Sequence, residues 1–440
     1  MDSVKNNADA IIFYTAICFE AKANSLYRRA KSEFCSRLLR HKCLRNGGWY
    51  EMANIIDYII WRGDLSFETA PFNEVDNLIL SELSYLNFEG IVAGDGDKEI
   101  PLYKAAEIYF NEERDLEHNT GDLTDENFYK MLKLMAESKR YGEIRLLYYV
   151  KKTDTLKEMQ FSAITLDIGN KTLFISFRGT DDTLIGWKED FMMSVMDVVP
   201  SQKEALKYFN KVADNYMHHK LYLGGHSKGG NLAVYSAAYA KARNKARIIN
   251  IYNNDGPGFK ETILETKNYM EISDRIITLV PQSSVIGMLL EHEENYTVLR
   301  SNQKGIMQHD GFSWEVKGPK FIHLKKVTRE SVIADKTIKN FLNGISVERR
   351  REFTNALFEI VSTNEYTTLT DIRDSRWKAF TAMIKTYDKL DADLKKAVKN
   401  TVALLLNEGM RNIIKVDYPD EWRGKLPKIN KLIQQRRRSE

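Results

Sequence analysis

Apolar side chains recur at helical intervals at both ends of this chain. Residues 55–60, 74–86 and most of 102–151 carry them at spacings of three and four, which predicts helices. In the clearest of these segments the apolar positions are Val75, Leu78, Ile79, Leu83 and Leu86. From about residue 327 to the end, the pattern is helical throughout.

Strand patterns occupy the middle of the chain, and the first of them begins at Phe161. Residues 161–166 and 172–177 flank a turn sequence and predict a hairpin. An amphipathic helix is predicted over 201–219, and further buried strands are predicted at 221–223, 247–252, 275–280 and 296–300. Strands that alternate with helices favour a mainly parallel α/β sheet.

The pentapeptide Gly225-His226-Ser227-Lys228-Gly229 has the G-x-S-x-G form of a nucleophile elbow, a sharp turn from strand to helix. Glycines flank the serine because side chains there would clash across the turn. A short apolar strand precedes the motif and an alanine-rich helix, 231–238, follows it. This context predicts Ser227 as a nucleophile, against the alternative of a structural glycine-rich turn.

A serine nucleophile needs a base, and the chain contains three histidines after Ser227: His292, His309 and His323. His309 follows the last predicted strand in a turn-like segment, where an α/β-hydrolase places its base. His323 has the apolar neighbours of a structural histidine, and the glutamates around His292 indicate an exposed side chain. His309 is therefore the predicted base, and His226 is expected to pack structurally.

The predicted acid is Asp255, at the carboxyl end of the strand that follows the elbow helix. The alternative is a turn aspartate that caps Asp-Gly-Pro-Gly. Glu291 and Asp310 remain open as other acids.

Two backbone N–H groups are expected to bind the oxyanion. One belongs to Lys228, directly after the nucleophile, and the other to the loop Arg178-Gly179-Thr180, where the Thr180 hydroxyl could add a third donor. Arg178 can equally form a structural ion pair. Met288 and Leu289, together with Leu290, are candidates for an apolar acyl-binding wall or lid, with ordinary core residues as the alternative.

These motifs resemble the class 3 lipase branch of the α/β-hydrolases, on residues 175–180, Trp187, Asp190 and 225–231. More closely, the chain is similar to a bacterial lipase-like family, the Mbeg-like family, on the segments 52–57 and 253–259. The resemblance covers roughly residues 52–325. It implies a lipase-type fold with Ser227 as nucleophile and with Thr180 and Lys228 in the oxyanion hole.

The sequence departs from class 3 lipases at two positions. Those lipases usually keep an aspartate after the strand equivalent to 275–280, where this chain has Pro281-Gln282-Ser283-Ser284. The departure favours Asp255, whose position resembles the acid of pancreatic-type lipases. Lys228 replaces a usually apolar residue, and a cation at the mouth of the site would favour an anionic or zwitterionic substrate.

The composition of the chain adds little to what these motifs indicate about its function. The formal net charge is +4 over 440 residues, so general nucleic-acid binding is not expected. Cys18, Cys35 and Cys43 all lie in the first 51 residues without a usual zinc spacing. We expect no metal and no organic cofactor, no membrane-spanning helix, and a reducing, cytoplasmic location.

We therefore predict an α/β-hydrolase with N-terminal helices, a mostly parallel central sheet and a C-terminal all-helical domain. The expected divisions are a dispensable extension 1–51, a hydrolase domain 52–326 and a helical domain 327–440. The expected activity is hydrolysis of acyl esters, with lysophospholipids among the candidates; a thioesterase, an amidase and a non-catalytic binding protein are the alternatives. Residues 331–440 carry 22 basic and 15 acidic side chains, which suits either a solvated packing domain or a peripheral membrane contact.

Overall fold

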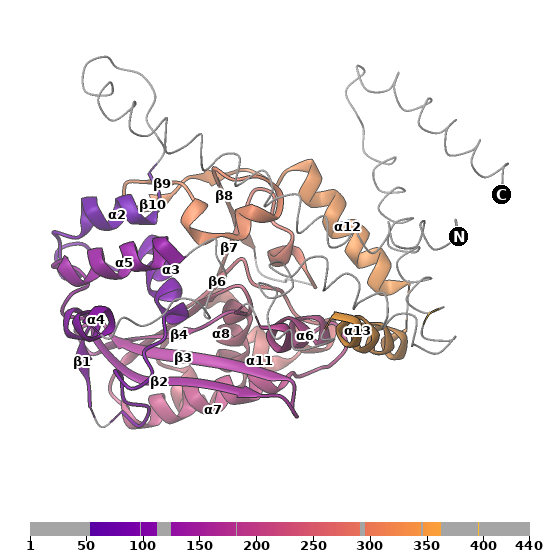
Figure 1. The fold of residues 1–440 in the computed structure, drawn as a ribbon, viewed down its shortest axis with the longest axis horizontal. Helices are drawn as coiled ribbons and strands as arrows, with labels where there is room; N and C mark the ends of the chain where they lie inside the picture. Colours follow the sequence, from indigo (N-terminus) through magenta and orange to yellow (C-terminus); the bar gives the residue numbers. More distant parts are fainter. Residues whose placement is uncertain are drawn as a thin grey trace, which may run out of the picture.

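The computed structural model describes residues 53–96, 98–111, 125–181, 183–290, 295–344, 346–361 and residue 395. It is a mixed α/β structure in which helices cover both faces of a large sheet (Figure 1). The predicted α/β class is thus confirmed. The predicted extension 1–51, with its three cysteines, lies outside the described residues, as does the tail beyond residue 361 apart from Lys395.

Nine strands of the described chain form one sheet in the order β1-β2-β3-β4-β5-β6-β7-β8-β11. Its parallel block consists of β4 (Thr172–Phe177), β5 (Lys220–His226), β6 (Ile248–Asn254), β7 (Ile276–Pro281) and β8 (Tyr296–Leu299). Antiparallel strands flank it: β1 (Ile100–Pro101), β2 (Arg145–Asp154) and β3 (Met159–Asp167) on one side, and β11 (His323–Leu324) on the other. The sheet is therefore mixed rather than mostly parallel. A separate hairpin joins β9 (Val316–Lys317) to β10 (Lys320–Phe321).

Strand β2 corrects one prediction, because the sequence pattern extended a helical region to residue 151. Leu146 and Leu147 are both fully buried, and they pack into the two cores on opposite faces of the sheet. A strand buried on both faces has no alternation of polar and apolar residues, so its sequence cannot be told from a buried helix by spacing. The predicted hairpin of β3 with β4 is confirmed.

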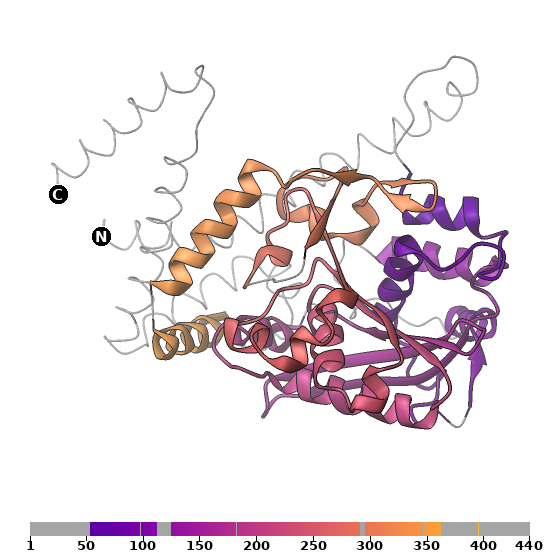
Figure 2. The same cartoon turned by 180° about the vertical axis from the view of Figure 1, so that it is seen from behind.

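Two helical layers enclose the sheet, as the view from behind in Figure 2 also shows. One core is formed with α2 (Ile55–Arg62), α3 (Glu74–Glu82), α4 (Leu102–Asn111) and α5 (Asp125–Glu137). The other is formed with α7 (Pro200–Asn215), α8 (Lys228–Tyr239), α10 (Glu261–Leu264) and α11 (Lys267–Met270); the short helix α9 (Ala242–Lys245) follows α8. Within the described ranges, no helix has both the length and the apolar character needed to cross a membrane.

Helices α2 and α3 begin where the predicted pattern begins because asparagines cap them. The Asn54 side chain accepts from the backbone of Asp57, whose side chain accepts in return from the Asn54 backbone. Asn73 and Asp76 repeat this arrangement at the start of α3. Each capping box satisfies backbone donors that the helix itself cannot use.

Two C-terminal helices, α12 (Arg329–Asn343) and α13 (Val347–Val361), follow the sheet. In Figure 1, α12 runs away from the sheet towards α13, which lies beside α6 (Leu184–Met192). The α13–α6 contact includes the rings of Phe358 and Phe191, whose centroids are 5.7 Å apart. The helical prediction is confirmed over these two helices; the boundary at residue 327 stays a prediction.

Candidate active site

Ser227 occupies a sharp turn between β5 and α8. Its backbone has φ 57° and ψ −134°, a conformation that a residue with a side chain rarely adopts. A side chain at Gly225 would meet the backbone of Gly229, and one at Gly229 would meet the carbonyl oxygen of Phe177. The surrounding packing therefore enforces the strained turn, and strain held in this way is typical of functional positions.

Asp255 follows the neighbouring strand β6, and its side chain is fully buried. Its Oδ2 atom lies 2.7 Å from Nδ1 of His309, and its Oδ1 atom accepts a hydrogen bond of 2.5 Å from the Ser284 hydroxyl. An ionised carboxylate can only accept, so Nδ1 of His309 carries the proton. This arrangement leaves Nε2 of His309 as an acceptor, the state that a general base requires.

His309 ends a short 3-10 helix, η5 (Gly305–His309), and its side chain is 24% exposed. Its carbonyl oxygen lies 2.7 Å from Nε2 of His226, and the two rings are 4.5 Å apart. Burial, and then the positive charge that His309 carries when it is protonated, lower the pKa of the His226 imidazole well below its usual value. His226 is thus a neutral histidine that holds the backbone of His309 beside the elbow.

The structure brings Asp255 and His309 together but does not complete the hydrogen bond to the serine. Among the described residues, neither the Ser227 hydroxyl nor Nε2 of His309 has a hydrogen-bond partner. Ser227 is partly exposed and immediately follows His226, which contacts His309 directly. In ligand-free enzymes this contact is often long and tightens only when substrate binds.

The loop after β4 passes directly beside the serine. A Cβ atom on Gly179 would lie 3.0 Å from Cβ of Ser227. The Thr180 hydroxyl donates to Oδ2 of Asp190 at 2.5 Å, so it is already engaged. The N–H groups of Thr180 and Lys228 are therefore the candidate oxyanion donors, without the predicted third donor. Burial raises the pKa of the Asp190 carboxyl to about 6.

The side chain of Lys228 corrects a second prediction, that of a cation at the mouth of the site. Only 1% of it is exposed, and its ammonium donates to Glu189 Oε2 at 3.1 Å and to Gln160 Oε1 at 2.9 Å. The lysine is the first residue of α8 and is buried between β3 and α6, where a charge needs a partner. Glu189 also accepts from the backbone N–H of Ser201, so the pair ties the elbow to α6 and to the start of α7.

The alternative residues take other positions. The Asp310 carboxylate accepts from the N–H of Phe312 and caps the 3-10 helix η6 (Gly311–Ser313); burial raises its pKa to about 6. His323 is exposed rather than set in the core, with Nε2 2.8 Å from Glu74. Glu291 and His292 lie outside the described residues. Arg178 forms a buried ion pair with Asp181 at 2.9 Å, as its structural interpretation predicted.

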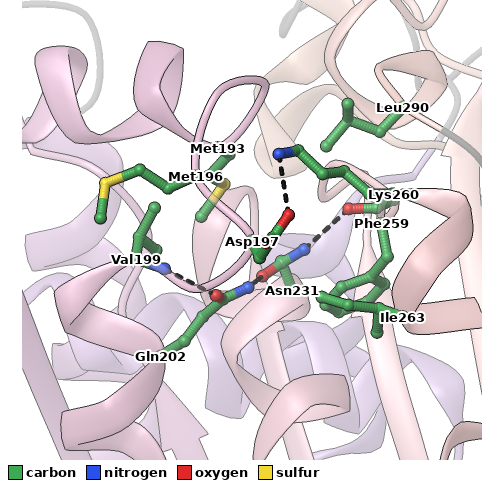
Figure 3. A pocket seen from close by; sticks show the side chains of 11 residues that line it. Met193, Met196, Asp197, Val199, Gln202, Asn231, Phe259, Lys260, Ile263 and Leu290 are labelled. Carbon is green, nitrogen blue, oxygen red and sulfur yellow. Dashed lines mark hydrogen bonds and ion pairs between the residues drawn. The ribbon is translucent and has the colours of Figure 1, made fainter. Parts of the chain in front are cut away.

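A small cavity lies between the segment joining α6 to α7 and the segment that follows β6 (Figure 3). Its volume is about 10 Å³, close to the least that a single water molecule needs, so an acyl chain would have to displace its walls. Lys260 reaches across it to Asp197 at 3.2 Å. The apolar side chains that line it are Met193, Met196, Val199, Phe259, Ile263 and Leu290.

Met288 and Leu289, the predicted acyl wall, lie just before the cavity-lining Leu290. The Leu289 carbonyl accepts from the N–H of Gly258 at 2.8 Å, which places this segment beside the loop that follows Asp255. Their role in binding stays a prediction. In the described ranges, no group of three or more His, Cys, Asp or Glu side chains could hold a metal ion.

The chain matches the model of one protein family, described as Mbeg1-like, over residues 135–359. This region includes Ser227, Asp255 and His309. The comparison with curated proteins finds no significant match.

Several solved lipase structures resemble parts of the chain. A fungal lipase in an inhibitor complex matches with 16% identity over 35% of this chain and 66% of its own, slightly under two thirds, at a TM-score of 0.28. The lipase of Rhizopus microsporus var. chinensis matches with 15% identity over 65% and 93%, at a TM-score of 0.32. A triacylglycerol lipase described as having a serine protease triad at its catalytic centre matches with 14% identity over 51% and 78%, also at 0.32.

Proposed function

This chain belongs to the Mbeg1-like family, and from the geometry of its site we propose that it is a serine hydrolase that cleaves carboxylic acyl esters. The observation that carries the proposal is the combination of a strained elbow serine with a histidine–aspartate pair. The aspartate directly follows the adjacent strand β6, and the histidine is held to the elbow through His226.

In the proposed reaction, the Ser227 hydroxyl attacks the ester carbonyl and its proton passes to Nε2 of His309. The Asp255 carboxylate keeps the Nδ1 proton in place and stabilises the imidazolium that forms. The N–H groups of Thr180 and Lys228 stabilise the oxyanion. His309 then protonates the leaving alcohol, and a water molecule releases the acid from the acyl-enzyme by the same steps.

The structure removes the reason that the sequence offered for an anionic or zwitterionic substrate. Because the Lys228 ammonium is buried and paired with Glu189, it is not available to bind an anionic headgroup. Lys228 therefore gives no support to lysophospholipids as substrates. Thioesters and amides use the same triad chemistry, so the ester assignment depends on direct measurement.

A fluorophosphonate probe tests the proposal, because it reacts only with an activated serine. We expect the native protein to be labelled at one site and Ser227→Ala to be unlabelled. The control is Ser273→Ala, which should be labelled like the native protein. Ser273 lies just before the amino end of β7, whereas the site lies at the carboxyl ends of the parallel strands. A series of p-nitrophenyl esters, thioesters and anilides would then rank the three substrate classes.

A non-catalytic binding protein is the second candidate, and the missing hydrogen bond between Ser227 and His309 is the observation that favours it. Folded native protein that stays unlabelled by the probe and hydrolyses none of the three substrate series would overturn the enzyme assignment in its favour.

A further inference from the structure

The turn after β7, residues 281–284, touches the acid of the proposed triad. Ser284 is 2% exposed, and its hydroxyl donates to Oδ1 of Asp255. The other oxygen of Asp255 pairs with His309. Each carboxylate oxygen of Asp255 therefore has a side-chain partner. One partner is His309, the proposed base, and the other is Ser284.

The first turn of α12 holds the same turn. The Ser331 hydroxyl donates to the Ser284 carbonyl at 2.6 Å, and Ser331 itself is 1% exposed. Thr328, directly before α12, donates its N–H to the Gln282 carbonyl at 2.6 Å, and its hydroxyl lies 2.9 Å from that of Ser283. The start of α12 is thus bonded to three consecutive residues of the turn.

The segment that carries the base is bonded to this turn as well. Gln308 precedes His309, and its side-chain carbonyl accepts from the N–H of Ser283 at 2.8 Å. One turn therefore connects the acid, the residue beside the base and the first turn of a C-terminal helix.

We propose that Ser284 is a positioning residue of the triad and that Thr328 and Ser331 at the start of α12 hold it in place. The proposal rests on the proposed function of Ser227, His309 and Asp255. The last side-chain torsion of an aspartate has broad, weakly separated minima, so one hydrogen bond to His309 does not fix the plane of the carboxylate. The second bond, from Ser284, fixes that plane and with it the direction of the imidazole. Helix α12 is then a part of the catalytic apparatus.

This role also gives a physical account of the departure from class 3 lipases in the sequence. The turn that would carry an acidic residue carries Ser284 instead, and the acid lies directly after the adjacent strand β6. A second carboxylate beside Asp255 would repel it, whereas a hydroxyl donates to it.

The test uses the full chain with p-nitrophenyl butyrate as substrate. In metal sites, a partner that orients a ligating side chain is typically worth about ten- to a hundredfold in activity. Ser284 orients Asp255 in the same way, so Ser284→Ala is expected to lower kcat by roughly that factor with little change in KM. Ser331→Ala is expected to lower kcat by a smaller factor, because it acts on Asp255 only through Ser284. Thr337→Ala is the matched control, because it removes a hydroxyl that bonds to the Ile333 carbonyl further along the same helix. In an Asp255→Ala background, which removes the acceptor of the Ser284 hydroxyl, Ser284→Ala should have no further effect, whereas a purely structural role would lower activity in both backgrounds.

A proton NMR measurement keeps this test separate from that of the proposed function. The Nδ1 proton of His309, shared with a carboxylate, gives a far-downfield resonance, which is identified by its loss in His309→Ala. We expect Ser284→Ala to shift or broaden it and Thr337→Ala to leave it unchanged. If Ser284→Ala does not fold, Ser284→Cys, which keeps a weak donor, takes its place. An unaltered resonance, or a kcat equal to that of Thr337→Ala, overturns the proposal, whichever bond the protein cleaves.

Discussion

The two sides of the proposed site are built in different ways. On the nucleophile side, backbone segments meet at van der Waals distance around Gly225 and Gly229, and the buried Lys228–Glu189 pair locks the elbow to α6. On the acid side, hydrogen bonds between side chains join Asp255 to residues 29 and 54 positions further along the chain.

This difference predicts two kinds of failure. Close packing and buried charge pairs are coupled to the whole fold, so a change on the nucleophile side is expected to appear first as lost stability. A lost side-chain hydrogen bond costs less stability, but it releases the direction of a catalytic group, so a change on the acid side is expected to appear first as lost rate.

The sharpest contrast in rate should come from two aspartates near the base. Asp255→Asn is expected to lower turnover by about ten-thousand-fold, because it removes the charge that holds the tautomer of His309. Asp310→Asn should leave turnover close to native, since Asp310 accepts from Phe312 instead. Steady-state kinetics on the purified variants measure both turnover numbers. A larger loss in Asp310→Asn than in Asp255→Asn would assign the role of the acid to Asp310. Ser227→Ala and His309→Ala set the baseline of complete loss.

On the nucleophile side, Lys228→Met is expected to destabilise the fold by about 3–5 kcal/mol, because it leaves Glu189 buried without its counter-charge. The backbone N–H of residue 228 remains, so the folded fraction should keep most of its turnover. The control is Lys241→Met, which breaks an exposed pair with Asp214 and should cost no more than about 1 kcal/mol. Urea unfolding compares them, and equal costs for the two variants would remove the distinction between the two sides.

The two sides also differ in how far the sequence predicts them. The elbow is encoded within five consecutive residues, and the order of Ser227, Asp255 and His309 along the chain suggested a pairing of the last two that the structure contains. The direction of the Lys228 side chain was not predictable in this way, because it depends on how α6 packs over the elbow.

No sequence pattern predicted the contact between Ser284 and Ser331. They lie 47 residues apart, in segments with no motif, and they meet only when α12 docks on the turn after β7. The missing acidic residue in 281–284 was the nearest hint, since it drew attention to the turn without saying what Ser284 does. Tertiary packing also explains why β2 was predicted as helix. Its burial on both faces removes the alternation by which strands are recognised in a sequence.

A smaller effect is expected in how the free energy of unfolding depends on pH, and it should distinguish Asp310 from the proposed acid, Asp255. Burial raises its pKa from 3.8 to about 6, so the folded chain binds this proton more tightly than the unfolded chain does. The free energy of unfolding should therefore fall as pH rises from about 4 to about 6. Asp310→Asn keeps the acceptor for Phe312 and should remove the part of this slope that Asp310 contributes; Asp190, whose pKa burial also raises to about 6, contributes in the same direction.

At pH 7 the Asp310→Asn variant is expected to be more stable than the native protein by about 1–2 kcal/mol. This is less than the full equivalent of the pKa shift, because the carboxyl is partly exposed. Chemical denaturation at pH 4 and pH 7 gives the difference, with Asp274→Asn, an exposed aspartate, as the control. A native protein that gains stability over this range through Asp310 would contradict the prediction.

The smallest effect is expected from the first residues of the chain. Deleting residues 1–51 should leave turnover unchanged and shift the melting temperature by less than about 5 °C, as the cluster of cysteines and the start-like segment 52–57 suggest.

Contacts of the described residues show how far such a deletion can extend. The Ala53 carbonyl accepts from the N–H of Val316 at 2.6 Å, and Asn54 caps α2. Deletion of residues 1–62 is therefore the control, because it removes α2 with its buried Ile55, Tyr58 and Ile59 and should abolish cooperative unfolding. Equal damage from both deletions would show that the first 51 residues are part of the folded unit.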